Sequence, residues 1–188
     1  MHSKTAYIVG AGDFCDDSFH PGPGDLVIAA DGGYDALLQA GLTAHLLLGD
    51  MDSIQAAPGG IPLLRFPKRK DETDMALGVR LAQARGYTRF KLYGALGGRL
   101  DHSLANLHLL AGLARDGLQG VIISGDVLVR ALCRGSLALP PLRPGRIVSV
   151  FSWGGPAHGV SLKGLKYPLA GATLAADSAL GVSNEALG

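Results

Sequence analysis

The chain has 188 residues, 47% of them hydrophobic and 18% charged, so it can bury a substantial core and is not disordered as a whole. The net charge of +1 is unevenly spread: residues 1–64 carry one lysine and eight aspartates, whereas residues 65–188 carry sixteen basic and eight acidic side chains. A nucleic-acid-binding protein is more often basic throughout its binding domain, so we expect no nucleic-acid partner.

The sequence also predicts where the protein is found. No apolar run approaches the about 18 residues that a membrane-spanning helix needs, and the N-terminus lacks the pattern of a signal peptide. The two cysteines, Cys15 and Cys133, lack metal-ligand spacing and are expected to be reduced thiols. We therefore expect a cytoplasmic protein without a membrane partner.

The first two thirds of the chain alternate between strand-like and helix-like segments. Apolar runs that stop at Gly, Asp or Pro predict strands, and apolar residues at helical spacing predict helices. In chain order we expect strands over 4–10 and 26–30, a helix over 34–40, strands over 46–48 and 61–66, a helix from Asp71 or Thr73 to Gln83, a strand over 89–93, a helix over 101–115 and a strand over 121–124. This alternation predicts an α/β domain over residues 1–125 with a doubly wound, mainly parallel sheet.

From residue 126 the pattern changes to short strand-like runs separated by Gly and Pro, and no segment has convincing helical spacing. The runs lie at 127–132, 136–139, 146–151, 159–162 and 165–169. We predict a small antiparallel β-sandwich domain over residues 126–188.

Aspartates gather where the predicted strands end or the following helices begin. Fourteen of the sixteen acidic side chains are Asp, a residue that favours loops and caps. Ligands of an open α/β sheet bind beyond the carboxyl ends of its strands, and neighbouring carboxylates favour a hard cation such as Mg²⁺ between them. A turn or N-cap role is the alternative for any one of them, and for Asp71 both remain open. The set is Asp31, Asp50, Asp52, Asp71, Asp74 and Asp101.

Basic residues stand beside these carboxylates. The basic run 68–70 ends in Lys70, directly before the predicted helix, and Arg99 lies two residues before Asp101. Arg and Lys bind phosphate oxygens, so the mixture is typical of a nucleotide-phosphate site. His102 can contact a phosphate or cap the helix that begins there.

Six segments, taken in order and spacing, resemble the signature blocks of the bacterial thiamine pyrophosphokinase (thiamine diphosphokinase) family. Together they cover nearly the whole chain, and their ordered combination is more specific than any one block. They are Ala30–Gly33, Gly49–Ile54, Lys70–Asp74, Gly94–His102, Gly164–Leu169 and Gly181–Glu185.

The resemblance implies an enzyme that converts ATP and thiamine to AMP and thiamine diphosphate, and a homodimer whose active site is shared between subunits. It implies that Asp50, Asp52, Asp74 and Asp101 are catalytic and serve Mg²⁺ and the ATP phosphates, with the first three as metal ligands. The expected ATP contacts are Asp31, Lys70, Asp71, Arg99 and His102. The expected thiamine contacts are Tyr167, Ser183 and Asn184. Asp101 could orient the attacking hydroxyl, act as a weak base or only hold metal.

Two other classes of protein share part of this pattern. A Mg²⁺-dependent, nucleotide-using transferase acting on another alcohol would need the aspartates but not the blocks around Tyr167 and Asn184. A non-catalytic thiamine-binding protein would need those two blocks but not carboxylates delivered by four loops.

Overall fold

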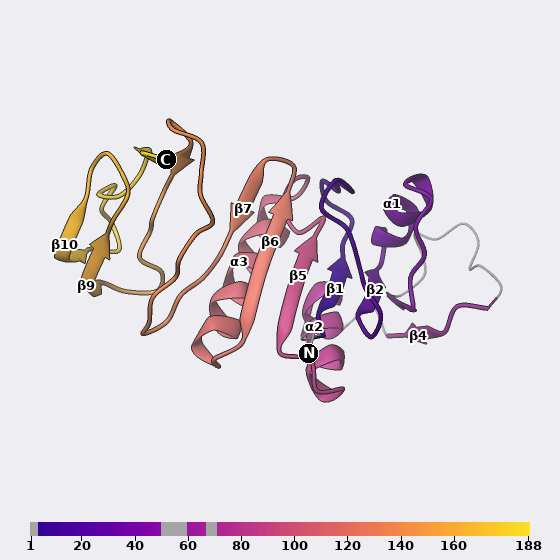
Figure 1. The fold of residues 1–188 in the computed structure, drawn as a ribbon. Helices are drawn as coiled ribbons and strands as arrows, with labels where there is room; N and C mark the ends of the chain where they lie inside the picture. The colour runs from indigo at the N-terminus through magenta and orange to yellow at the C-terminus, as the bar shows by residue number, and fades with distance from the viewer. Residues whose placement is uncertain (1–3, 50–59, 67–70) are drawn as a thin grey trace. The chain divides into compact units, whose positions relative to one another are not determined.

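The computed structural model describes residues 4–49, 60–66 and 71–188 of the chain. Asp50, Asp52 and Lys70, three of the predicted site residues, lie outside these ranges. The chain folds into two compact units, Met1–Arg134 and Gly135–Gly188 (Figure 1). In the part that is described, no helix has the length and apolar character needed to cross a membrane.

The first unit is built on one sheet in the order β4-β3-β2-β1-β5-β6-β7. All neighbouring strands are parallel except β6 and β7, which are antiparallel. The strands are β1 (Ala6–Val9), β2 (Leu26–Ala30), β3 (Leu46–Gly49), β4 (Leu63–Arg65), β5 (Arg89–Tyr93), β6 (Gln119–Ser124) and β7 (Val127–Val129). Because successive strands run outward from β1 on one side and from β5 on the other, the strand order reverses between β1 and β5. That switch point is where an open α/β sheet binds its ligands.

Helices cover both faces of the sheet, as the doubly wound prediction requires (Figure 1). Helices α2 (Asp74–Ala84) and α3 (Leu100–Arg115) pack on one face with a core that includes Ile8 and Leu92. Helix α1 (Gly33–Gln39) packs on the other, with Tyr7 and Val9. The residues of a strand divide between these two cores because successive side chains point to opposite faces of the sheet. The predicted α/β fold with its mainly parallel sheet is confirmed.

Helix α2 resolves an alternative left open by the sequence. Its N-cap is Thr73, whose Oγ1 accepts a hydrogen bond of 3.2 Å from the Ala76 N–H. A threonine in that position satisfies one of the unpaired donors of the first turn. Asp71 therefore lies before the helix, exposed, and is free of the capping role.

The second unit contains two small antiparallel sheets, as the sequence predicts for this part of the chain. One pairs β9 (Ala157–Leu162) with β10 (Leu169–Leu174), and the other pairs β8 (Ile147–Val148) with β11 (Asn184–Glu185). The run 136–139 forms no regular element. Residues 165–168 precede β10 and form no regular strand, and Leu165 makes an isolated bridge with Ala186.

The strand predicted at 127–132 belongs to the first unit, so the structural boundary lies later than the predicted one at 125/126. Gly125 and Asp126 form a two-residue turn, with Gly125 at φ +50°, that folds β7 back onto β6. Such tight turns join antiparallel neighbours. The hairpin keeps β7 in the large sheet.

Candidate functional site

At the switch point, backbone hydrogen bonds connect the loop after β1 to the loop after β5. The N–H groups of Gly10, Gly12 and Asp13 donate hydrogen bonds of 2.9 Å to the carbonyls of the loop that begins at Tyr93. A side chain on Gly12 would collide with the Leu96 carbonyl, and one on Gly94, which has φ +57°, with the Gly10 carbonyl. The close approach of the two backbones therefore depends on glycine.

Asp31 lies where β2 ends, in a backbone conformation that is unusual for a side-chain-bearing residue. Its φ is +49°, a left-handed conformation that Asp tolerates better than most residues. Its N–H donates a bond of 2.7 Å to the Leu48 carbonyl, and a Cβ on Gly49 would lie 3.3 Å from its Cα. Asp31 thus sits against the residue that precedes Asp50 in the sequence.

Asp74 is brought to the same edge by the first turn of α2. It is the first residue of the helix and is half-buried. The neighbouring Met75 packs so closely on Gly10 that a Cβ there would lie 2.7 Å from its terminal methyl. The nearby Glu72 forms an ion pair of 2.9 Å with Arg80.

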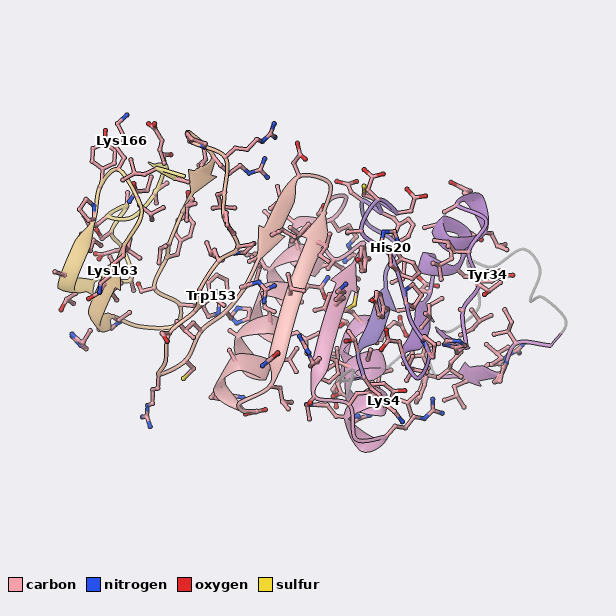
Figure 2. The ribbon with its side chains drawn as sticks, viewed as in Figure 1. Lys4, His20, Tyr34, Trp153, Lys163 and Lys166 are labelled. Carbon is pink, nitrogen blue, oxygen red and sulfur yellow. The ribbon has the colours of Figure 1, made fainter. Side chains whose placement is uncertain are left out.

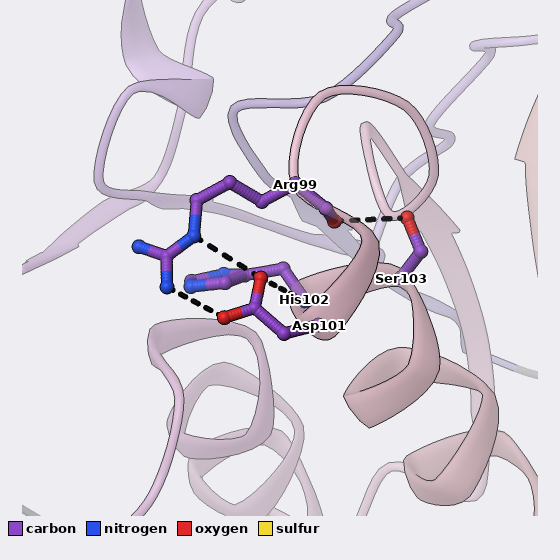
Figure 3. Close-up of polar contacts among 4 residues, drawn as sticks. All are labelled: Arg99, Asp101, His102 and Ser103. Atoms are coloured by element: carbon purple, nitrogen blue, oxygen red, sulfur yellow. Dashed lines mark hydrogen bonds and ion pairs between the residues drawn. The ribbon is translucent and has the colours of Figure 1, made fainter.

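Arg99 and Asp101 form a two-point ion pair at the start of α3 (Figure 3). Arg99 Nη2 donates to Oδ2 at 2.6 Å and Nε donates to Oδ1 at 3.1 Å, and the His102 N–H donates to Oδ1 at 3.0 Å. These bonds, that from Arg99 above all, lower the pKa of Asp101, and the carboxylate in turn raises the pKa of Arg99. Asp101 is therefore held in its ionised form, the form that binds cations.

His102 lies inside the first turn of α3, because the N-cap of that helix is Arg99. The N-cap position is therefore that of Arg99, whose side chain makes no capping bond, and His102 does not hold the capping position. Its side chain is exposed beside the Arg99–Asp101 pair, which leaves the phosphate-contact alternative as the prediction for it.

Two further polar residues belong to this edge and were not identified from the sequence. Asn106 of α3 is only 6% exposed and donates a bond of 2.8 Å to the Ala95 carbonyl, which anchors the loop before Arg99. Asp13 is exposed, and its carboxylate covers Gly97 so closely that a Cβ there would collide with it. Two features of the sequence could have identified them: Asn106 is in line with the apolar face of its helix, and Asp13 follows the first predicted strand.

The donor chemistry of this edge suits Mg²⁺, which prefers carboxylate oxygens. Among the described residues, however, Asp31, Asp74 and Asp101 do not form a set with ligand atoms within 4.8 Å of one another. The triple that does is Cys15, Asp16 and Asp17, and its thiol is a poor ligand for Mg²⁺. Asp50 and Asp52, the other predicted ligands, lie outside the described residues.

An open pocket of about 320 Å³ adjoins this edge, between the loop after β1 and α1. Phe14 contributes an aromatic ring to its wall, and Asp35 and Gln39 contribute polar groups. The pocket is large enough to accept part of a small organic ligand.

In the second unit, the structure brings together Tyr167 and Asn184. The Tyr167 side chain is largely exposed, and Lys166 Nζ lies 5.6 Å from the centroid of its ring. Lys166, which projects from the surface in Figure 2, also forms an ion pair of 2.9 Å with Glu185, and that bond raises its pKa. Asn184 is buried and bonded to the backbone of Tyr167.

Ser183 shares the unusual backbone of Asp31. Its φ is +56°, its N–H donates a bond of 3.0 Å to Ser149 Oγ, and its side chain is exposed. Residues held in such conformations cluster at binding sites, where the surrounding structure sustains the strain. Both units thus carry a strained polar residue within a predicted site.

Comparison with known proteins identifies relatives for both units. Residues 23–122 match the family model "Thiamin pyrophosphokinase, catalytic domain", and residues 137–188 match "Thiamin pyrophosphokinase, vitamin B1 binding domain". Thiamine pyrophosphokinase from Bacillus subtilis (strain 168) is 29% identical over 169 residues, which are 85% of this chain and 78% of the relative.

Solved structures agree in fold. The crystal structure of Bacillus subtilis thiamine pyrophosphokinase matches with a TM-score of 0.88 and 24% identity, covering 99% of this chain and 91% of that one. The thiamin pyrophosphokinase of Geobacillus thermodenitrificans matches with a TM-score of 0.81 and 27% identity, over 98% of this chain and 89% of that one.

Proposed function

Because the chain belongs to the thiamine pyrophosphokinase family, we propose that the switch point of its first unit binds Mg²⁺ and ATP and that its second unit binds thiamine through Tyr167. The chain is a thiamine diphosphokinase, which transfers the pyrophosphoryl group of ATP to the hydroxyl of thiamine and releases AMP. The observation that carries the site proposal is the convergence of Asp31, Asp74 and the Arg99–Asp101 pair on the loops at one edge of the sheet. Neither alternative class has an observation in its favour.

Asp50, Asp52 and Asp74 are the proposed ligands of Mg²⁺. When bound, the ion would neutralise charge on the phosphate oxygens of ATP. Asp52→Asn keeps the side-chain shape but removes a charge that the ion requires. We expect turnover to fall at least ~100-fold, because even changes beyond the direct ligands of a metal cost 10–100-fold. Near-normal turnover of this variant at saturating Mg²⁺ would contradict the assignment.

The basic groups Lys70, Arg99 and His102 are proposed to contact the phosphates, with Asp31 and Asp71 beside them. In the reaction the thiamine hydroxyl attacks the β-phosphorus, the bond from that phosphorus to the oxygen shared with the α-phosphate breaks, AMP leaves with that oxygen and the hydroxyl proton passes to solvent. Asp101 is a weak base, because Arg99 holds its pKa below the usual range. We therefore propose that Asp101 supplies negative charge and positions groups at the phosphates, and that it does not remove the hydroxyl proton.

Tyr167 is proposed to present its ring to thiamine, whose thiazolium carries a permanent positive charge. The ring is 60% exposed, so a ligand can reach it, and an aromatic face attracts cations. Ser183, exposed next to Asn184, is proposed to hydrogen-bond the pyrimidine. Tyr167→Ala should raise the KM for thiamine and leave the KM for ATP unchanged. An unchanged thiamine KM would remove Tyr167 from the site.

We propose a homodimer with a shared active site. Large apolar side chains are exposed on β7 and across the second unit, among them Leu128, Ile147, Phe151 and Trp153. A unit of this size buries little core alone and gains from pairing. The free cysteines Cys15 and Cys133 agree with the reducing cytoplasm, where we place the enzyme.

Mixing Asp52→Asn with Tyr167→Ala tests the shared site, when thiamine is kept well below the raised KM of Tyr167→Ala so that each variant alone has little activity. If Asp52 and Tyr167 serve one site from different subunits, each heterodimer of Asp52→Asn with Tyr167→Ala has one intact site and one doubly altered site. Random pairing makes about half of the dimers heterodimers, so the mixture should regain about a quarter of wild-type activity. If the subunits exchange and the mixture stays inactive, both residues serve a site within one chain.

A further inference from the structure

The side chain of Asn184 is occupied by the protein itself. It is 2% exposed. Its Oδ1 accepts hydrogen bonds of 2.9 Å from the N–H groups of both Tyr167 and Glu185, and its Nδ2 donates one of 2.6 Å to the Tyr167 carbonyl. An asparagine amide has two acceptor positions and two donor hydrogens, so at most one hydrogen remains. Buried and bonded in this way, Asn184 offers no surface to a ligand.

The bonds from Asn184 hold Tyr167, which follows residues 164–166 and is not held by strand pairing as they are. Residues 164–166 pair with the end of the chain, through bonds from the Lys166 N–H to the Glu185 carbonyl and from the Leu187 N–H to the Gly164 carbonyl. The pairing cannot continue past Tyr167, because Pro168 has no N–H to donate. Instead, the Tyr167 N–H donates to the side-chain amide of Asn184, and the Tyr167 carbonyl accepts a hydrogen bond from the same amide.

The ring of Tyr167 has no comparable anchor of its own. Tyr167 is 60% exposed, and its ring and hydroxyl are in reach of the Lys166 ammonium, which lies 5.6 Å from the ring centroid. That ammonium is itself paired with Glu185 at the surface. The place from which the ring projects therefore depends on the backbone that Asn184 holds.

We propose that Asn184 is a positioning residue, which acts on thiamine binding by holding the backbone of Tyr167 and does not contact thiamine. The inference rests on the proposed role of Tyr167 in binding thiamine. It assigns Asn184 a different role from that of the neighbouring Ser183, whose side chain is exposed.

A double-mutant cycle separates the two roles that Asn184 could have. Asn184→Ala is measured in the wild type, in Tyr167→Phe, which keeps the ring, and in Tyr167→Ala, which removes it. We expect the thiamine KM to rise about 10-fold in the first two backgrounds, as for the loss of about 1.4 kcal/mol of binding, with the ATP KM unchanged. In Tyr167→Ala the further rise should be less than about twofold, because no ring is left to position.

Each other result has a definite meaning. An equal rise in all three backgrounds shows that Asn184 contacts thiamine directly and overturns the inference, as does an unchanged thiamine KM in the first two. If Asn184→Ala does not fold, Asn184→Ser takes its place, because its uncharged hydroxyl keeps a polar group there but is too short to reproduce the three hydrogen bonds of the amide. A Tyr167→Ala variant with wild-type thiamine KM overturns the proposed role of Tyr167 itself, which is a distinguishable failure.

Discussion

The bond from Asn106 to the Ala95 carbonyl connects the stability of the first unit to its proposed ATP site. In Asn106→Ala that carbonyl, which belongs to a residue only 2% exposed, loses its 2.8 Å partner. Leaving a buried acceptor unsatisfied costs about 1–3 kcal/mol. For a chain of this size, 1 kcal/mol corresponds to roughly 2–4 °C in Tm, so we expect Tm to fall by about 2–12 °C.

The same change should impair the enzyme beyond its loss of stability. The loop released by Asn106→Ala includes Gly94, Gly97 and Gly98, all at positive φ, and ends at Arg99. With the anchor gone, the Arg99–Asp101 pair is less well positioned for the phosphates. We expect kcat/KM for ATP to fall about 10–100-fold at a temperature where the variant is folded, because displacements of about 1 Å can cost that much.

A second substitution in the same helix provides the control. Gly112 lies in α3, and among the described residues a Cβ placed there would meet the end of the Arg115 side chain at 3.9 Å, an ordinary van der Waals contact. Gly112→Ala should therefore stabilise the helix by roughly 0.5–1 kcal/mol. In the double variant with Asn106→Ala, thermal unfolding should show part of the stability regained while kcat/KM stays low. Recovery of kcat/KM together with Tm would refute the positioning role of Asn106.

Three further results are expected. Gly33→Ala should lower Tm, with a cost of about 1–3 kcal/mol, because its Cβ would collide with the Val9 carbonyl and push α1 from β1; an unchanged Tm would show that α1 is not packed as described. Arg99→Gln should raise the pKa of Asp101 towards its usual range, as measured by NMR titration of the carboxyl carbon. Because the pKa of Asp101 is depressed in the folded protein, the contribution of the ion pair to stability is present at neutral pH and is lost as the pH falls through that pKa. Ser183→Gly should raise the free energy of unfolding by roughly 0.5–1 kcal/mol in denaturant titrations, since left-handed strain of about 1–2 kcal/mol exceeds the entropic cost of glycine.

The central part of the sheet could be predicted because strands such as β1, β2 and β3 are buried throughout and read as continuous apolar runs. The run at 26–30, for example, is a strand with the same bounds, and all five of its residues are buried. The short strands of the second unit lack this signal. β11 consists of Asn184 and Glu185, and nothing in their residue types distinguishes a strand from a loop. The pairing that makes it a strand comes from β8, more than thirty residues away.

The edge of the sheet at which candidate residues lie was predictable where the ends of strands and the starts of the following helices were enough. Asp31 and Asp74 could be placed at one edge, because parallel strands end together there. The roles of Asn106 and Asn184 could not be predicted, because each depends on a carbonyl that only the folded chain brings near. Sequence reasoning grouped Asn184 with the thiamine contacts, whereas its partner in the structure is the backbone of Tyr167.

The most direct test of the account is the identity of the products. Purified protein is incubated with ATP, Mg²⁺ and thiamine, and the nucleotides and thiamine phosphates are separated by chromatography. Transfer of a pyrophosphoryl group predicts AMP and thiamine diphosphate in equal amounts, formed at least ~100-fold more slowly by Asp52→Asn. Formation of ADP and thiamine monophosphate instead would mean single-phosphoryl transfer and would contradict the central claim.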